Sequence, residues 1–410
     1  MIIKKLIAKA VRDSRGEKTI KVIVKTNRKF KTSAPEGKST GKYEAKPYFR
    51  NLDGDIKIIN SIDINKINKL IQKKDVKTVS QAFLFLSNVE KLVKNKIGAN
   101  SLFALEASLL KALAYENGKE LWKFLGGKKE NTKNIRPVGN AIGGGLHGEG
   151  IKKKEPDFQE FLFIANGKNF EECVKINDIA YELTNKFVKS WIRNDEGAWE
   201  TGKTNEETLM ILDKVRQIIK EEYKKEIDIG VDIASSSFYK NGKYNYKNPE
   251  VDLNKKHQIL YIKELINRYK LFYVEDPLDE NDFSGFKELL KEVKKAKNQK
   301  NKNCLIVGDD LTTTNPERLK KAIKTKSINA IIIKPNQIGS LLKLKEVIDI
   351  AKKNKIKTII SHRSGETKDN TIADLAIAWN CDFIKTGIYG KVRTRKLKRV
   401  IEIEKNWMIF

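Results

Sequence analysis

The feature that most constrains the fold is a series of short apolar runs, each ending in an ionisable residue. The runs read IDIGVD, LFYVE, CLIVGD, INAIIIK, KTIISH and CDFIK, and a helical pattern follows most of them. Their last residues are Asp232, Glu275, Asp309, Lys334, His362 and Lys385. Buried strands that alternate with helices form parallel sheets, and in a closed barrel the functional groups collect at the C-terminal ends of the strands. The pattern therefore predicts an α/β barrel with a site at one rim.

The residue types at these strand ends predict a metal site beside a general base. Asp232, Glu275 and Asp309 supply the oxygen ligands that Mg²⁺ prefers, and they leave positions for water and substrate. A metal on a carboxylate or phosphate oxygen stabilises the negative charge that forms when the adjacent carbon loses a proton. Lys334 could take that proton if its pKa were lowered, and we expect Lys385 and the metal to lower it. The set points to proton abstraction next to a carboxylate.

Several of these residues also have a purely structural interpretation. An aspartate at a strand end, such as Asp232, is usually a helix cap or a turn residue. Pro277 could simply end the VEDP strand, and either Asp309 or Asp310 could cap a helix or turn. Lys334 is harder to explain in this way, because a charge after the apolar run INAIII costs stability unless it has partners or a task.

Composition narrows the class of protein. The 410 residues are 40% hydrophobic and 33% charged, which is typical of a globular chain large enough for two domains. No apolar stretch approaches the ~20 residues that span a bilayer, and the first residues lack the apolar core of a signal peptide. The three cysteines are far apart and odd in number. We therefore expect reduced thiols, a cytoplasmic location and no membrane partner.

The net charge of +29 is unusual for a globular chain. It could support weak, salt-sensitive binding to nucleic acid or to anionic surfaces. The simpler interpretation is a solvated, lysine-rich surface, because the sequence has no zinc knuckle, repeat or basic motif interleaved with aromatic residues. The charge does not identify the function, and it does not require a nucleic-acid partner.

The N-terminal part of the chain has a different organisation. Residues 1–26 read as a hairpin around the turn DSRGE. Three helical patterns follow, and the clearest covers residues 101–118, where apolar residues recur at helical spacing. Residues 123–137 are polar and rich in turn formers. We therefore predict a domain boundary in this stretch, with one domain over residues 1–127 and a barrel domain over residues 137–410.

Segments typical of the enolase family run in order along nearly the whole chain. The most specific are SHRSGET (361–367), KPNQIGSL (334–341), GDDLTTTNPERL (308–319) and VEDPLDENDF (274–283). They are accompanied by DSRG, GKSTGKYEA, GGGLHG, QEF, NDEG, GVDIASSSFY and IKTG. By these segments the chain resembles enolases, and the resemblance implies a fold: a (β/α)₈ barrel variant of the form ββαα(βα)₆ with an N-terminal α+β capping domain.

The resemblance also implies an activity. Enolases are phosphopyruvate hydratases, lyases that reversibly dehydrate 2-phospho-D-glycerate to phosphoenolpyruvate in glycolysis and gluconeogenesis. Sites of this superfamily combine a lysine or histidine base with one or two Mg²⁺ ions. For this chain the resemblance implies two Mg²⁺ ions in each active site, a cytoplasmic location and a homo-oligomer, either a dimer or larger.

Individual roles are implied for the positions that match the family motifs. The implied metal ligands are Asp232, Glu275 and Asp309 for the tightly bound ion, and Ser39 in the mobile loop for the second. The implied proton-transfer groups are Lys334 as base at C2 and Glu196 as acid at the C3 hydroxyl, supported by Glu160. The implied substrate contacts are Lys385 at the carboxylate, Arg363 and Ser364 at the phosphate, with His362 beside them, the loop residue His147, and Gln159 in support.

Some of these segments depart from the family pattern. The mobile loop usually reads P-S-G-A-S-T-G, whereas Glu36, Gly37 and Lys38 precede Ser39 in this chain. After IKTG the chain continues IYGKVRTRKLKR, where the family usually has a proline and an Arg-Ser-Glu-Arg motif near the subunit contact. These changes put the rate of loop closure and the dimer geometry in question. None of them removes a residue that performs chemistry.

Two other functions stay open at this point. A catalytically impaired protein with the enolase fold could bind nucleic acid or other acidic partners through its basic surface, in which case salt would weaken binding steeply. A member of the wider superfamily could act on a different carboxylate. Those enzymes generally lack the SHRSGET and KPNQIGS segments that this chain has.

Overall fold

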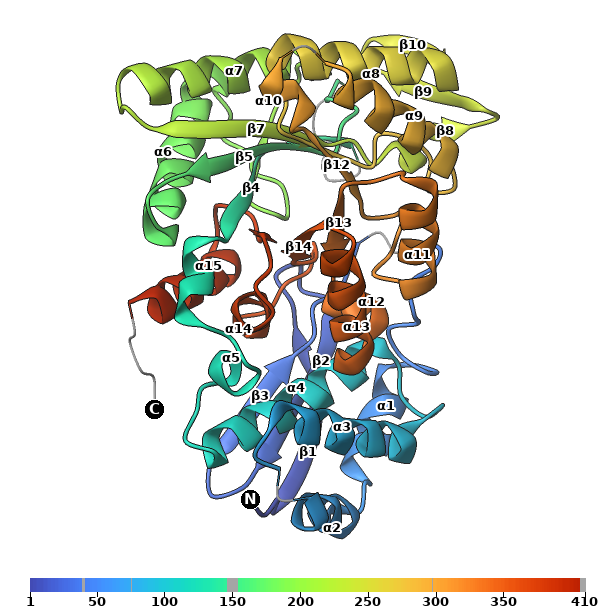
Figure 1. Cartoon of the computed structure of the whole chain (residues 1–410), viewed down its shortest axis with the longest axis vertical. Coiled ribbons are helices and arrows are strands. Elements are labelled where there is room, and N and C mark those ends of the chain that lie inside the picture. The colour runs from blue at the N-terminus through green and yellow to red at the C-terminus, as the bar shows by residue number, and fades with distance from the viewer. Residues whose placement is uncertain (39–40, 75, 146–153, 297, 406–410) are drawn as a thin grey trace.

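The computed structural model describes residues 1–410 except 39–40, 75, 146–153, 297 and 406–410. Its N-terminal part is a three-stranded antiparallel sheet followed by helices (Figure 1). The strands are β1 (Lys5–Arg12), β2 (Lys18–Lys25) and β3 (Lys29–Ser33). The helices are α1 (Leu52–Asn60), α2 (Ile64–Lys74), α3 (Val79–Val93), α4 (Ala99–Glu116) and α5 (Leu121–Phe124). The hairpin expected near the N-terminus is confirmed. The sequence predicted three helices after it, whereas the structure has the four longer helices α1–α4 and the short helix α5.

The N-terminal sheet buries one face against α4. Successive residues of a strand point to opposite faces, and Val22 and Val24 of β2 are fully buried. Phe103 of α4 belongs to the same core cluster, and the Ser108 hydroxyl donates a hydrogen bond to the Val22 carbonyl at 3.1 Å. The alternating sequence of β2 therefore follows from burial of one sheet face under a helix.

The C-terminal part is a closed barrel. Its strands, in chain order, are β4 (Arg136–Gly143), β5 (Glu160–Asn166), β7 (Glu226–Asp232), β11 (Tyr273–Glu275), β12 (Leu305–Gly308), β13 (Ala330–Ile333), β14 (Lys357–Ser361) and β15 (Phe383–Lys385). Neighbours in this order pair, and β15 pairs with β4 to close the ring. Only β5 runs against its barrel neighbours, β4 and β7. A short strand, β6 (Trp199–Glu200), adds to the end of β4.

The order of helices confirms the predicted ββαα(βα)₆ barrel, which lies above the N-terminal sheet in Figure 1. The first two barrel strands precede α6 (Phe170–Val188) and α7 (Asn205–Glu221). The helices after the other six strands are α8 (Lys255–Tyr269), α9 (Phe283–Lys294), α11 (Pro316–Thr325), α13 (Leu341–Lys353), α14 (Thr371–Ala378) and α15 (Lys391–Glu404). None of the described helices has the length and apolarity needed to cross a membrane.

Shorter elements occupy the connections of the barrel. A small antiparallel sheet precedes α8, and single-turn helices lie before β4, β8, β12 and α13. These elements are η1 (Lys129–Lys133), η3 (Ser235–Phe238), β8 (Tyr239–Lys240), β9 (Lys243–Lys247), β10 (Glu250–Asn254), α10 (Gln299–Lys302) and α12 (Pro335–Ile338).

Side chains that alternate along the strands fill the barrel and then form its mouth. The interior core includes Tyr273, Val307, Ile332 and Phe383. Because side chains on one face of a strand recur every second residue, the next inward positions are those two residues further on. These positions are Glu275, Asp309, Lys334 and Lys385. The antiparallel β5 brings its first residue, Glu160, to the same rim, opposite Asp232 of β7.

Glu106 of α4 is a fully buried carboxyl group that contacts the start of α13. Its Oε2 accepts a hydrogen bond from the backbone N–H of Leu341 at 2.7 Å. Burial, and then the neighbouring Glu90 carboxylate, raise the pKa of Glu106 well above its usual value. A carboxyl group whose pKa is raised by folding stabilises the fold fully below its unfolded pKa of ~4.3, and this contribution is lost as the pH rises through the folded pKa.

We expect Glu106→Gln to stabilise the protein at pH 8 by about 1 to 3 kcal/mol, the usual penalty of an ill-satisfied buried polar group. The amide can accept from Leu341 and donate to Glu90 without any proton uptake. Urea unfolding at pH 5 and pH 8 measures the effect, with Glu264→Gln on the exposed face of α8 as control. The difference in unfolding free energy between Glu106→Gln and the wild type should be smaller at pH 5 than at pH 8. An equal difference at both pH values would refute this account of Glu106.

Candidate active site

The predicted site residues line one cavity of about 290 Å³ at the C-terminal ends of the barrel strands. Those in its wall are Gln159, Glu160, Glu196, Asp232, Asp309, Lys334, His362, Arg363, Ser364 and Lys385. Glu275 lies directly behind them, in contact with Lys385. Two further predicted residues, Ser39 and His147, lie outside the described residues. The cavity also contains Glu44 and Asp276, which the sequence analysis assigned to no role.

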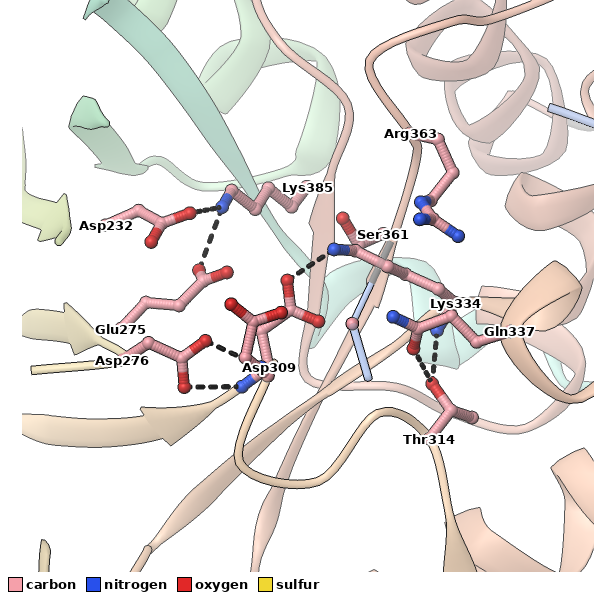
Figure 2. Close-up of polar contacts among 12 residues, drawn as sticks. Asp232, Glu275, Asp276, Asp309, Thr314, Lys334, Gln337, Ser361, Arg363 and Lys385 are labelled. Atoms are coloured by element: carbon pink, nitrogen blue, oxygen red, sulfur yellow. Dashed lines mark hydrogen bonds and ion pairs between the residues drawn. The ribbon is translucent and has the colours of Figure 1, made fainter. Parts of the chain in front are cut away.

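Lys385 contacts three buried carboxylates, of which Figure 2 shows those of Asp232 and Glu275. Its Nζ lies 2.8 Å from Glu160 Oε2, 3.0 Å from Asp232 Oδ2 and 2.9 Å from Glu275 Oε2. Burial by itself would lower the pKa of Lys385, but the carboxylates of Asp232, Glu160 and Glu275 together raise it well above its usual value. One ammonium group cannot neutralise three carboxylates, so this end of the cavity keeps an excess of negative charge.

The excess charge and two unpartnered oxygens fit a divalent cation. Glu275 Oε1 and Asp309 Oδ1 are buried, and no group in the described part of the chain forms a hydrogen bond with them. Burial, and then the Asp232 carboxylate, raise the pKa of Glu275 well above its usual value. Carboxylate oxygens are the ligands that Mg²⁺ prefers. The residues present therefore suit the cation that the sequence analysis expected.

Lys334 at the end of β13 forms an ion pair with Asp309 (Figure 2). Burial would lower the pKa of Lys334, but the Asp309 carboxylate outweighs it and the pKa is raised. The expected lowering of the Lys334 pKa is not found in this arrangement, because the Asp309 carboxylate raises it. Arg363 is the cation that lowers the pKa of Lys334. A neutral Lys334 thus requires that Asp309 be engaged elsewhere.

A second group of carboxylates overlaps the predicted ligands. Oxygen atoms of Asp276, Asp309 and Asp310 lie within 4.8 Å of one another. Asp276 uses one oxygen to accept from the Asp309 N–H at 3.1 Å and the other to accept from the Asp310 N–H at 2.6 Å. Burial, and then Asp309, raise the pKa of Asp310 to about 7. Both Asp276 oxygens already accept hydrogen bonds from backbone N–H groups. Glu275 and Asp309, which each have an unpartnered oxygen, are therefore better placed to bind a cation.

His362 lies between Glu196 and a buried arginine. Its Nε2 is 3.9 Å from Glu196 Oε2, and Arg393 Nη1 donates to its Nδ1. Burial, and then the Arg393 charge, lower the pKa of His362 well below its usual value. The ring is therefore neutral, and with Nδ1 accepting from Arg393 its proton lies on Nε2, which faces Glu196.

Arg393 was missed by the sequence analysis. Its side chain is among the largest fully buried ones. It also donates to the backbone carbonyls of Ser364 at 2.8 Å and Asp195 at 3.1 Å, which ties together the loops that carry His362 and Glu196. It lies in the KVRTRKLKR run, in which Lys396 and Arg399 are buried as well, and the sequence pattern did not distinguish these residues from the exposed basic ones.

The opposite end of the cavity is basic. Arg363 is buried beside Asn336 and Glu44. The Ser364 hydroxyl accepts from the backbone N–H of Lys38 at 2.7 Å and from Arg15 Nη1 at 3.3 Å. The cavity is thus acidic where Lys385 lies and basic where Arg363 lies, and Lys334 stands between these ends.

This fold and cavity define a (β/α)₈-barrel protein with an acidic, lysine-bordered site at the C-terminal ends of its strands. Two family models match the chain: "Enolase, N-terminal domain" over residues 3–125 and "Enolase, C-terminal TIM barrel domain" over residues 134–408. The chain belongs to the enolase family.

Similar curated proteins carry the same family name. An enolase of Archaeoglobus fulgidus is 36% identical over 417 residues, which cover 98% of this chain and 97% of that protein. An enolase of Natronomonas pharaonis is 37% identical, with 96% of each chain covered. An enolase of Ehrlichia canis is 35% identical, with 98% of this chain and 96% of that protein covered. The similarity thus extends over both parts of the chain.

Proposed function

We propose that this protein catalyses the reversible, Mg²⁺-dependent dehydration of 2-phospho-D-glycerate to phosphoenolpyruvate. The observation that carries the proposal is a single cavity with an acidic end at Lys385, a basic end at Arg363 and Lys334 between them. A substrate with a carboxylate and a phosphate on neighbouring carbons fits such a cavity. Membership of the enolase family supports the same substrate and a requirement for Mg²⁺.

Asp232, Glu275 and Asp309 would hold the tightly bound Mg²⁺, and Ser39, outside the described residues, would contribute to a second site. An ion bound to the three carboxylates would stabilise negative charge that develops on the substrate carboxylate. The unpartnered oxygens of Glu275 and Asp309 support this assignment. The number of ions, two, rests on the family resemblance.

Lys334 takes the C2 proton in this proposal, and Lys385 binds the substrate carboxylate. Lys334 can accept a proton only as a neutral amine, so its ion pair with Asp309 has to be broken first. Arg363 then favours the neutral amine by its charge. Loss of the C2 proton leaves an electron pair that must later expel the C3 hydroxyl group.

Glu196 donates the proton with which the C3 hydroxyl leaves as water, and Glu160 supports it. Nε2 of the neutral His362 faces Glu196 Oε2 at 3.9 Å, so the ring would donate to the acid once this separation closes. Arg363 and Ser364 would bind the phosphate, with Gln159 supporting the substrate contacts and His147 closing over the substrate. The roles of Gln159 and His147 rest on the family resemblance alone.

The protein acts in the cytoplasm as a homo-oligomer, and residues 1–127 and 137–410 form its two domains. The element order is compatible with that division, since α5 ends at Phe124 and β4 begins at Arg136. No observation favours a catalytically impaired nucleic-acid binder instead, because all the described residues that carry the proposed chemistry share one cavity or touch its wall.

Removal of Mg²⁺ is expected to abolish turnover, and its return to restore it. The direct measurement is the ultraviolet absorbance of phosphoenolpyruvate formed from 2-phosphoglycerate, after dialysis against a chelator and after addition of MgCl₂. Mg²⁺ should also raise the melting temperature of the dialysed protein, since a ligand that binds the folded chain stabilises it. Turnover that survives chelation would count against the proposed function.

A further inference from the structure

We propose that Glu44 is a positioning residue that orients Arg363 for the substrate phosphate and connects this arginine to the backbone of Lys334. The inference rests on the proposed function, and nothing in the chemistry described so far uses Glu44. This residue follows the loop at Gly41, and 8% of its side chain is exposed. A buried carboxylate is retained in a fold only when it is well paired.

Glu44 grips the guanidinium group of Arg363 with both oxygens. Arg363 Nη1 donates to Oε2 at 2.9 Å and Nη2 donates to Oε1 at 3.1 Å. Two parallel bonds between a planar fork and a carboxylate fix the plane of the guanidinium group as well as its position. Asn336 Oδ1 accepts from Nη1 at 3.3 Å and adds a further constraint. Protein groups, and not the substrate, thus fix the position and plane of the Arg363 guanidinium group.

Glu44 also accepts bonds from the loop and from the barrel. The backbone N–H of Gly41 donates to Oε1 at 2.7 Å, and Gln337 Nε2 donates to Oε1 at 3.1 Å. These described partners of the Glu44 carboxylate, together with Arg363, are all donors, which suits an acceptor-only group. A second contact joins the same loop to the cavity wall, because the backbone N–H of Lys38 donates to the Ser364 hydroxyl. Loop position and phosphate recognition therefore depend on shared contacts.

The connection to Lys334 has a fixed direction (Figure 2). The backbone N–H of Lys334 can only donate, so Thr314 Oγ1 accepts from it at 2.9 Å. The Thr314 hydroxyl hydrogen is then available for Gln337 Oε1, which lies 2.6 Å away. This bond sets the orientation of the Gln337 amide, so that its Nε2 faces Glu44. A chain of hydrogen bonds thus joins the proposed base to the proposed phosphate ligand.

The first test is Glu44→Gln, which keeps the size of the side chain but removes its charge. We expect KM for 2-phosphoglycerate and the dissociation constant of inorganic phosphate to rise about 10- to 100-fold, the usual effect of an ångström-scale misplacement. The melting temperature shows that the variant is folded, and Glu264→Gln on the surface is the matched control. Unchanged constants in folded Glu44→Gln would overturn the inference. Tighter phosphate binding would also overturn it, because Glu44 would then compete with phosphate for Arg363.

Phosphate binding needs no turnover, so calorimetry separates this inference from the proposed function. A wild-type protein that binds phosphate but forms no phosphoenolpyruvate would contradict the proposed function, while Glu44→Gln would still decide the role of Glu44. If Glu44→Gln does not fold, Glu44→Asp keeps the charge at a shorter reach. We expect weaker phosphate binding in Glu44→Asp than in the wild type, and equal binding would overturn the inference.

The second test concerns the connection to Lys334. Thr314→Val keeps the shape of the side chain and removes the hydroxyl group, whereas Thr314→Ser keeps the hydroxyl. We expect kcat to fall in Thr314→Val with a smaller change in KM, and Thr314→Ser to restore kcat. A loss of similar size in both variants would mean that packing matters and the hydrogen bond does not, and the connection would be rejected.

Discussion

Replacing Lys334 with alanine is expected to lower turnover of 2-phosphoglycerate about 10³-fold or more, toward the upper end of what one general base contributes. Lys334 follows β13, and its side chain is 17% exposed in the cavity. The other described lysines of the cavity wall are Lys42, which interacts with Glu280, and Lys385, which the carboxylates of the acidic end keep protonated. Nothing nearby is therefore placed to replace Lys334 as a base.

Lys334→Ala should bind Mg²⁺ at least as well as the wild type, because Asp309 loses a competing ammonium group. Steady-state rates measure turnover, calorimetry measures Mg²⁺ affinity, and a melting curve shows whether the variant is folded. Lys343→Ala, an exposed lysine on α13, is the matched control and should keep wild-type activity. Substantial turnover in a folded Lys334→Ala protein would contradict the assignment of the base.

Replacing Lys385 with methionine is expected to abolish turnover and to tighten Mg²⁺ binding. The Lys385 ammonium group and a divalent cation compete for the same carboxylates, Asp232 and Glu275. Methionine keeps much of the side-chain volume but removes the competing charge. The substrate carboxylate loses a proposed partner at the same time, so the catalytic loss and the gain in metal affinity should appear together.

Although Lys385→Met should bind Mg²⁺ more tightly, we expect it to be less stable than the wild type when no metal is present. Removing one partner of a buried ion pair costs about 3 to 5 kcal/mol, because the remaining charge is left uncompensated. We therefore expect Lys385→Met to melt well below the wild type in a chelator and to gain more from added Mg²⁺. Lys320→Met, whose partner Glu317 is exposed, controls for loss of a lysine. A variant with wild-type melting temperature and wild-type Mg²⁺ affinity would refute this description of the acidic end.

The residues at the strand ends could be predicted from the sequence, because two local features of the sequence agree there. An apolar run that ends in one charge marks a buried strand, and side chains on one face recur every second residue. For this reason Glu275, Asp309, Lys334 and Lys385 point into the barrel mouth, directly above the interior core. The closed ring and the order of its helices followed from the same alternation and from the family resemblance.

The supporting residues could not be predicted, because their partners are distant in sequence. Glu44 and Arg363 are separated by 319 positions, and Arg393 and Asp195 by 198. Asp276 follows Glu275 directly and was interpreted only as part of a strand end. Its structural use, accepting from the N–H groups of Asp309 and Asp310, depends on the neighbouring strand β12. Only the folded barrel brings these groups together.

The most direct test of the central claim is exchange of the C2 hydrogen of 2-phosphoglycerate with solvent deuterium, followed by NMR in two variants. Glu196→Gln should still exchange this hydrogen through Lys334 but form little phosphoenolpyruvate, because the acid for the C3 hydroxyl is missing. Lys334→Ala should do neither. Exchange that persists in Lys334→Ala, or that disappears in Glu196→Gln while Lys334 is intact, would contradict the proposed division of acid and base.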